Sequence, residues 1–203
     1  MSVFAEEEVQ GFINNGFVAV RGAFSPELAS QCRDEIWKLI EENHPDVKRN
    51  NPSTWTKNFI RIEGSDAEPI AKAANTPRLR QAFDEIVGVN RYKARNGIGT
   101  FPIRFPSIQK PDAAGWHIDG SIEVEDHRDG YNYTINLVSD NRALLVLFLF
   151  TDITEIDGPT RLAIGSHSDV VKALEHADPK VGMFSNDILE EINFDEGNYQ
   201  IDQ

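Results

Sequence analysis

The chain has 203 residues, of which 40% are hydrophobic and 26% are charged, so it is long and apolar enough for one folded domain with a buried core. Its net charge of −13 argues against nucleic acid and against an anionic membrane surface as partners, because both are bound through basic faces.

Cys32 is the only cysteine, which excludes an intramolecular disulfide and a structural zinc site built on thiolates. Its apolar neighbours along a helical stripe favour a buried, unreactive thiol over a reactive one. The first residues lack a basic segment followed by a long apolar run, and the longest apolar run, 143–150, is too short to span a bilayer. We therefore expect a cytoplasmic protein with no membrane partner.

Helical patterns dominate the first 90 residues. Apolar residues at helical spacing predict a first helix that ends at Gly16, followed by a short strand over 17–20. Ser25 and Thr76 each precede a proline, and a hydroxyl cap followed by proline is typical of a helix start. We expect helices at about 26–42 and 77–87. They should pack outside the sheet through Leu28, Ile36, Ile40, Leu79 and Phe83.

From about residue 97 the pattern changes to apolar, β-branched runs. Strands are predicted over 97–105, 115–123, 131–138 and 143–152, with a possible hairpin turn at 140–141. The run 143–150 is almost wholly apolar, which predicts a strand buried on both faces. A short helix is expected at 168–177, and the acidic tail from 179 has little pattern.

Helices followed by strands indicate an α+β fold in which the strands form a jelly roll or a similar double sheet. We expect one domain over 1–203, mainly helical over 1–90 and strand-bearing over 91–203. The highly charged stretch 123–130 is either a solvated loop or a lid over a site formed by the residues directly before it, 115–120.

The most informative segment is Gly115-Trp116-His117-Ile118-Asp119-Gly120. Side chains alternate between the faces of a strand, so His117 and Asp119 should point to one interior while Trp116 and Ile118 join the core opposite. An imidazole and a carboxylate are two of the three ligands of the facial triad that binds non-heme Fe(II). The alternative is a histidine satisfied by a backbone carbonyl beside an aspartate that ends the strand.

Three segments together carry a family resemblance. They are residues 12–22, the motif 116–120, and the stretch 157–167 with its Gly158-Pro159-Thr160-Arg161 and Gly165-Ser166-His167 sequences. The chain resembles the phytanoyl-CoA dioxygenase family, a branch of the Fe(II)/2-oxoglutarate-dependent oxygenases. The resemblance implies a double-stranded β-helix (jelly roll, cupin-like) with flanking N-terminal helices.

The resemblance also implies a reaction and its cofactors. By this resemblance His117 and Asp119 would hold Fe(II) as metal ligands and catalytic residues, with 2-oxoglutarate as the cosubstrate and O2 as the oxidant. Oxidative decarboxylation then gives succinate, carbon dioxide and an oxidant that hydroxylates a small organic substrate.

Two further parts of the family's site have no match within residues 168–203. One is a distal histidine, the third metal ligand, and the other is an arginine that binds the far carboxylate of 2-oxoglutarate. We expect the third ligand beyond Gln203 and the jelly roll to lack its last strands, with His167 as the in-chain alternative. Arg104 and Arg161 are the candidates for cosubstrate binding.

These residues leave more than one function open. The leading hypothesis is a dioxygenase whose turnover by residues 1–203 is impaired. A cupin-like metal-binding or non-catalytic binding module, and a non-oxidative metal enzyme on the same barrel, are the alternatives, because a fold does not fix a function.

Overall fold

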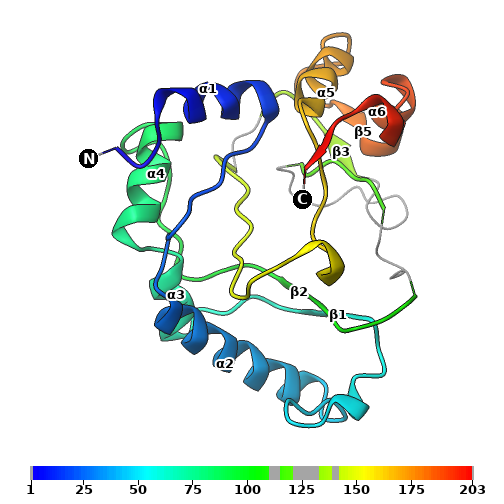
Figure 1. Cartoon of the computed structure of the whole chain (residues 1–203). Helices are drawn as coiled ribbons and strands as arrows, with labels where there is room; N and C mark the ends of the chain where they lie inside the picture. The colour runs from blue at the N-terminus through cyan, green and yellow to red at the C-terminus, as the bar shows by residue number, and fades with distance from the viewer. Residues whose placement is uncertain (1, 110–114, 121–132, 139–141, 203) are drawn as a thin grey trace. The chain divides into compact units, whose positions relative to one another are not determined.

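The computed structural model describes residues 2–109, 115–120, 133–138 and 142–202 (Figure 1). The chain divides into two compact units. The first comprises Met1–Val3, Val20–Ala114 and Phe148–Pro159, and the second comprises Phe4–Ala19, Gly115–Leu147 and Thr160–Gln203. The change from a helical to a strand-bearing part that we expected near residue 90 falls inside the first unit. One oxygenase-like domain over 1–203 stays a prediction.

The first unit joins helices to one antiparallel strand pair. Its elements are α2 (Pro26–Asn43), η1 (Pro52–Thr54), β1 (Phe59–Ile62), α3 (Glu68–Ala73), α4 (Pro77–Val87), β2 (Phe101–Arg104) and η2 (Glu155–Asp157). β1 pairs with β2 in the register that places Ile60 opposite Ile103. Residues of α2, α3 and both strands form one apolar core. Sequence analysis missed β1 and α3.

The predicted helix starts are confirmed. The Ser25 hydroxyl accepts a hydrogen bond from the Leu28 N–H at 3.2 Å, and the Thr76 hydroxyl accepts one from the Leu79 N–H at 3.3 Å. Both prolines occupy the first turn, where the missing N–H costs nothing. The helices expected at about 26–42 and 77–87 are α2 and α4.

The core of the first unit confirms part of the expected burial. Cys32 is fully buried, and its thiol donates to the Pro69 carbonyl at 3.3 Å. Ile40 and Leu79 are also buried. Three of the expected residues are only partly buried, and they are Leu28, Ile36 and Phe83.

The second unit contains short strands, three α-helices and one 3-10 helix among its described residues. Its elements are α1 (Glu6–Asn15), β3 (Thr134–Ile135), β4 (Leu162–Ala163), α5 (Ser166–Leu174), β5 (Met183–Phe184), α6 (Ser185–Glu191), η3 (Glu196–Asn198) and β6 (Ile201–Asp202). β3 pairs with β5 and β4 with β6, both antiparallel. Ile135, Ala173, Leu174 and Ile188 form its core. α1 ends at Gly16 as predicted, whereas α6 was not expected.

The strands in the structure are shorter than the sequence predicts. Of 97–105 only β2 and a bridge between Ile98 and Ser65 are present, and of 131–138 only β3 is described as a strand. Residues 17–20 and 115–120 form no strand. The described strands pair into two-stranded sheets, so the jelly roll remains a prediction. The charged stretch 123–130 and the turn 140–141 lie outside the described residues.

The apolar run 143–150 contradicts the prediction of burial on both faces. Leu145, Leu147 and Leu149 are exposed by 53%, 53% and 60%, whereas the residues between them are partly buried. The described residues place no ladder partner beside this run, so only alternate side chains are covered. Phe150 is buried, and its carbonyl accepts a hydrogen bond from Arg33 Nη1 at 2.6 Å.

None of the helices in the described ranges is long and apolar enough to cross a membrane.

Candidate metal site

The segment 115–120 is extended, and its side chains alternate as the sequence predicts. Ile118 packs against the core of the second unit, and Trp116 is half-buried. His117 and Asp119 point the other way and are 40% and 49% exposed. The described residues do not enclose the two side chains, so the interior that we expected around this pair stays a prediction.

His117 and Asp119 nevertheless lie side by side. The Nε2 atom of His117 is 3.8 Å from Oδ1 of Asp119. The other ring nitrogen of His117, Nδ1, lies 3.3 Å from the Gly115 carbonyl, which can only accept, so Nδ1 donates this hydrogen bond. Nε2 is the ring nitrogen that faces the carboxylate.

This donor pair fits a divalent iron ion. Imidazole and carboxylate bonds to such metals are about 2.0–2.2 Å long, so one ion can contact both atoms at the observed separation. The backbone hydrogen bond at Nδ1 is the usual support for a metal-binding histidine, since it fixes the tautomer and the ring orientation.

Tyr133 holds the backbone of the motif. Its hydroxyl donates to the Ile118 carbonyl, and the Gly120 N–H donates to the same hydroxyl at 3.3 Å. The ring lies so close to Gly120 that a Cβ atom there would be 3.0 Å from Cε2 of Tyr133. Tyr133 therefore fixes the peptide units on both sides of Asp119. Sequence analysis missed it, because a tyrosine in an expected strand carries no sign of such a contact.

His167 is engaged at the C-terminus of α1. Its Nε2 donates to the Ile13 carbonyl at 3.0 Å, and its ring packs against Gly16. Within the described parts of the chain, no group of three histidine, cysteine, aspartate or glutamate side chains is arranged to hold a metal. The structure thus brings together His117 and Asp119 and leaves His167 outside that pair.

The two candidate arginines belong to different units. Arg104 lies in β2 of the first unit, where its side chain passes close to Gly158. Arg161 belongs to the second unit, as do His117 and Asp119. Its guanidinium carbon is 5.4 Å from the centroid of the Trp116 ring, directly before His117 in sequence.

A stack of aromatic rings supports Trp116. Its centroid is 5.1 Å from that of Phe194, which is 4.9 Å from that of Tyr199. The Tyr199 hydroxyl donates to Asp169 of α5 at 3.0 Å. Partial burial and this carboxylate raise the pKa of Tyr199, while the hydrogen bonds from Lys172 and Tyr199 lower the pKa of Asp169. The unpatterned sequence of the tail gave no signal for this stack.

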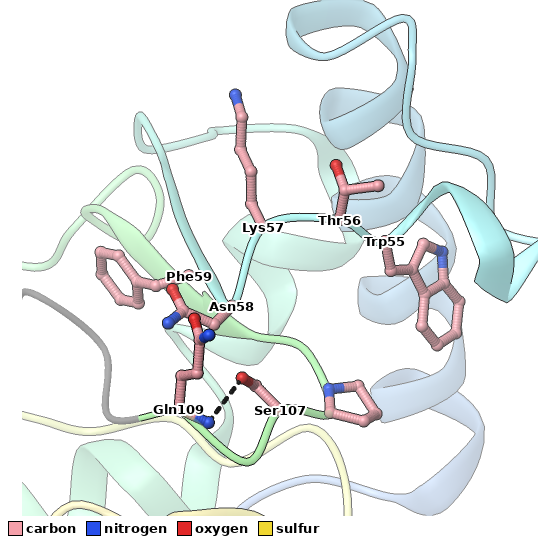
Figure 2. A pocket seen from close by; sticks show the side chains of 8 residues that line it. Trp55, Thr56, Lys57, Asn58, Phe59, Ser107 and Gln109 are labelled. Carbon is pink, nitrogen blue, oxygen red and sulfur yellow. Dashed lines mark hydrogen bonds between the residues drawn. The ribbon is translucent and has the colours of Figure 1, made fainter.

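A separate cavity of about 430 Å³ lies in the first unit (Figure 2). It is lined by Trp55, Thr56, Lys57, Asn58, Phe59, Pro106, Ser107 and Gln109. The Gln109 N–H donates to the Ser107 hydroxyl at 3.0 Å, and Lys57 points away from both side chains. The lining brings no histidine or carboxylate together, so it adds no candidate for acid–base or metal chemistry.

Comparisons of this chain with family models, with curated proteins and with solved structures gave no significant match.

Proposed function

We propose that this chain is an Fe(II)/2-oxoglutarate-dependent dioxygenase of the phytanoyl-CoA dioxygenase type, acting on a small organic substrate. One observation carries the proposal. It is the close pair of His117 and Asp119 on one side of an extended segment, 3.8 Å apart, with the histidine oriented by the Gly115 carbonyl. An imidazole and a carboxylate with open positions beside them are the donors that Fe(II) oxygenases use.

In this proposal the protein's own groups position the metal. His117 Nε2 and an Asp119 oxygen bind Fe(II), and Tyr133 holds the backbone between them. Bound Fe(II) supplies oxygen activation coupled to decarboxylation of 2-oxoglutarate. The side chains of His117 and Asp119 are 40% and 49% exposed, so a cosubstrate and a substrate can approach them.

The ligand count favours a second candidate function as well. The described residues add no third histidine or carboxylate to the pair, and Fe(II) on an incomplete ligand set is bound weakly. A metal-binding module without turnover is therefore the alternative proposal. Such a module would bind the metal at the same two residues but would not convert 2-oxoglutarate to succinate.

Succinate formation distinguishes the two proposals. The protein is loaded anaerobically with Fe(II), given 2-oxoglutarate and O2, and assayed for succinate with and without added imidazole, which can supply the missing nitrogen ligand. We expect little succinate without imidazole and more with it, in both cases abolished by His117→Ala. The dioxygenase proposal is wrong if Fe(II) binds through His117 and no succinate above the His117→Ala background forms under either condition. That result would support the binding module.

A further inference from the structure

The sequence contains two Asn-Gly pairs, Asn15-Gly16 and Asn96-Gly97, and both asparagine side chains are exposed. An asparagine followed by glycine is the one most prone to spontaneous deamidation, because glycine has no Cβ atom to shield its backbone nitrogen. The reaction requires that this nitrogen reach the side-chain carbonyl carbon of the asparagine. The two pairs differ in whether the structure leaves the nitrogen free to do so.

At the first pair, helical hydrogen bonds hold the backbone. Asn15 is the last residue of α1, and the Gly16 N–H donates to the Phe12 carbonyl at 2.9 Å. The Asn15 carbonyl accepts a hydrogen bond from the Gly165 N–H at 3.0 Å. The first bond directs the glycine nitrogen along the helix, away from the asparagine side chain. Both bonds must open before this nitrogen can attack.

At the second pair, the glycine nitrogen is free. Asn96 and Gly97 form a bend in the first unit. Within the described part of the chain, neither the Asn96 carboxamide nor the Gly97 N–H makes a hydrogen bond. The attack on the side chain therefore needs no hydrogen bond to be broken first.

The fold requires the glycine of this second pair. A Cβ atom at Gly97 would lie 2.1 Å from the Ser65 carbonyl oxygen, which no side chain can tolerate. Ser65 and Ile98 are joined by two backbone hydrogen bonds of 3.1 and 3.0 Å. On the other side of the pair, the Arg95 carbonyl accepts a hydrogen bond from Asn75 Nδ2 at 2.6 Å. The backbone is thus fixed before and after the reactive bond.

We propose that Asn96 is a site of spontaneous deamidation in the folded protein, whereas Asn15 is protected. The Gly97 nitrogen forms a bond to Cγ of Asn96, the bond between Cγ and Nδ2 breaks, and ammonia leaves with the proton of the Gly97 N–H. Water then opens the succinimide ring at either carbonyl, which gives aspartate or isoaspartate. This modification is independent of the proposed metal site.

Peptide mapping of aged protein tests the proposal. Protein is incubated in mildly alkaline buffer with and without denaturant, digested at mildly acidic pH, and analysed by mass spectrometry with fragmentation that distinguishes isoaspartate from aspartate. In native protein we expect Asn96 to convert about tenfold faster than Asn15 or more, because two hydrogen bonds protect Asn15. In denaturant the two rates should become similar. Asn96→Gln should remove the product at 96, since the larger ring closes far more slowly.

The proposal is overturned if Asn15 converts as fast as Asn96 in native protein, or if Asn96 converts only in denaturant. Either result would show that the backbone hydrogen bonds do not decide which pair reacts.

Isoaspartate has a structural consequence that aspartate lacks. It carries the main chain through the side-chain carbon, so it lengthens the backbone between the fixed Arg95 carbonyl and the bridge from Ile98 to Ser65. We expect the amides of this bridge to exchange hydrogen faster in the isoaspartate form, separated by ion exchange, than in Asn96→Asp, which has the same charge on an unaltered backbone. Equal exchange in the two proteins would contradict the fixed geometry on both sides of the pair.

Discussion

At the scale of single residues, Tyr133 would support the proposed metal site without being a ligand itself. Tyr133 bonds the Ile118 carbonyl and the Gly120 N–H, so it sets the direction of the peptides around Asp119. Such indirect support of metal ligands is commonly worth 10–100-fold in affinity, a rough range. Tyr133 is in this sense a positioning residue.

We expect Tyr133→Phe to lower the affinity for Fe(II) by about tenfold, because the motif loses the bridge between its two peptides. Anaerobic Fe(II) titration of the folded variant measures the change. Tyr92→Phe is the control, since the Tyr92 hydroxyl also donates to a backbone carbonyl, that of Arg80, but does so in the first unit. Equal affinities for the two variants would show that Tyr133 has no role at the site.

The buried thiol gives a second prediction at this scale. Burial raises the pKa of Cys32 to about 11, so almost none of it is thiolate at neutral pH. We expect native protein to react with a disulfide reagent at pH 8 only after denaturant is added, and then with one thiol. Rapid reaction of the native protein would mean that α2 does not cover Cys32.

At the scale of elements, His167 packs against the glycine that ends α1. Gly16 has φ of +89° and a Cβ there would lie 2.6 Å from Nδ1 of His167. Gly22 has φ of +64° with nothing within 4 Å. Both glycines have a positive φ, but only Gly16 also lies close to another side chain, that of His167.

Gly22→Ala should therefore cost about 1–2 kcal/mol of unfolding free energy through strain alone. Gly16→Ala should cost roughly 1–3 kcal/mol more, because the added methyl group collides with the imidazole. Urea denaturation measures both. In a His167→Ala background the excess should disappear, and an excess that persists would place the strain elsewhere.

The contact between α5 and the tail predicts a pH dependence. Hydrogen bonds from Lys172 and Tyr199 lower the pKa of Asp169 below its value in the unfolded chain, which is near 4. The stabilisation is therefore present above that pH and is lost as the pH falls through the folded pKa. We expect Asp169→Asn to melt below the parent protein at pH 6 and to converge with it in acid, with a small difference because Asp169 is partly exposed. A constant difference across this range would contradict the assignment.

At the scale of the whole molecule, the helix starts could be predicted from the sequence, whereas the pairing of the strands could not. The starts of α2 and α4 follow from Ser25 and Thr76, because capping is decided within a few residues. β1 was missed, and the run 143–150 was expected to be buried on both faces. Strand partners and coverage depend on residues far apart in the chain, so apolar patterns alone do not determine them.

At the candidate site too, the local arrangement could be predicted from the sequence and the long-range contacts could not. The side-by-side arrangement of His117 and Asp119 follows from the alternation of an extended chain, which is a local property. Their exposure, the support from Tyr133 and the stacking of Arg161 on Trp116 depend on contacts between distant segments. Those contacts leave no periodic trace in the sequence.

The central claim is that His117 and Asp119 hold one Fe(II) ion. Anaerobic equilibrium binding of Fe(II) to the parent protein, His117→Ala, Asp119→Ala and His167→Ala tests it most directly, with His167→Ala as the matched histidine control. We predict one ion per chain in the parent protein, loss of that ion in both His117→Ala and Asp119→Ala, and unchanged binding in His167→Ala. Equal binding by all four proteins, or a loss in His167→Ala as large as in His117→Ala, would contradict the account.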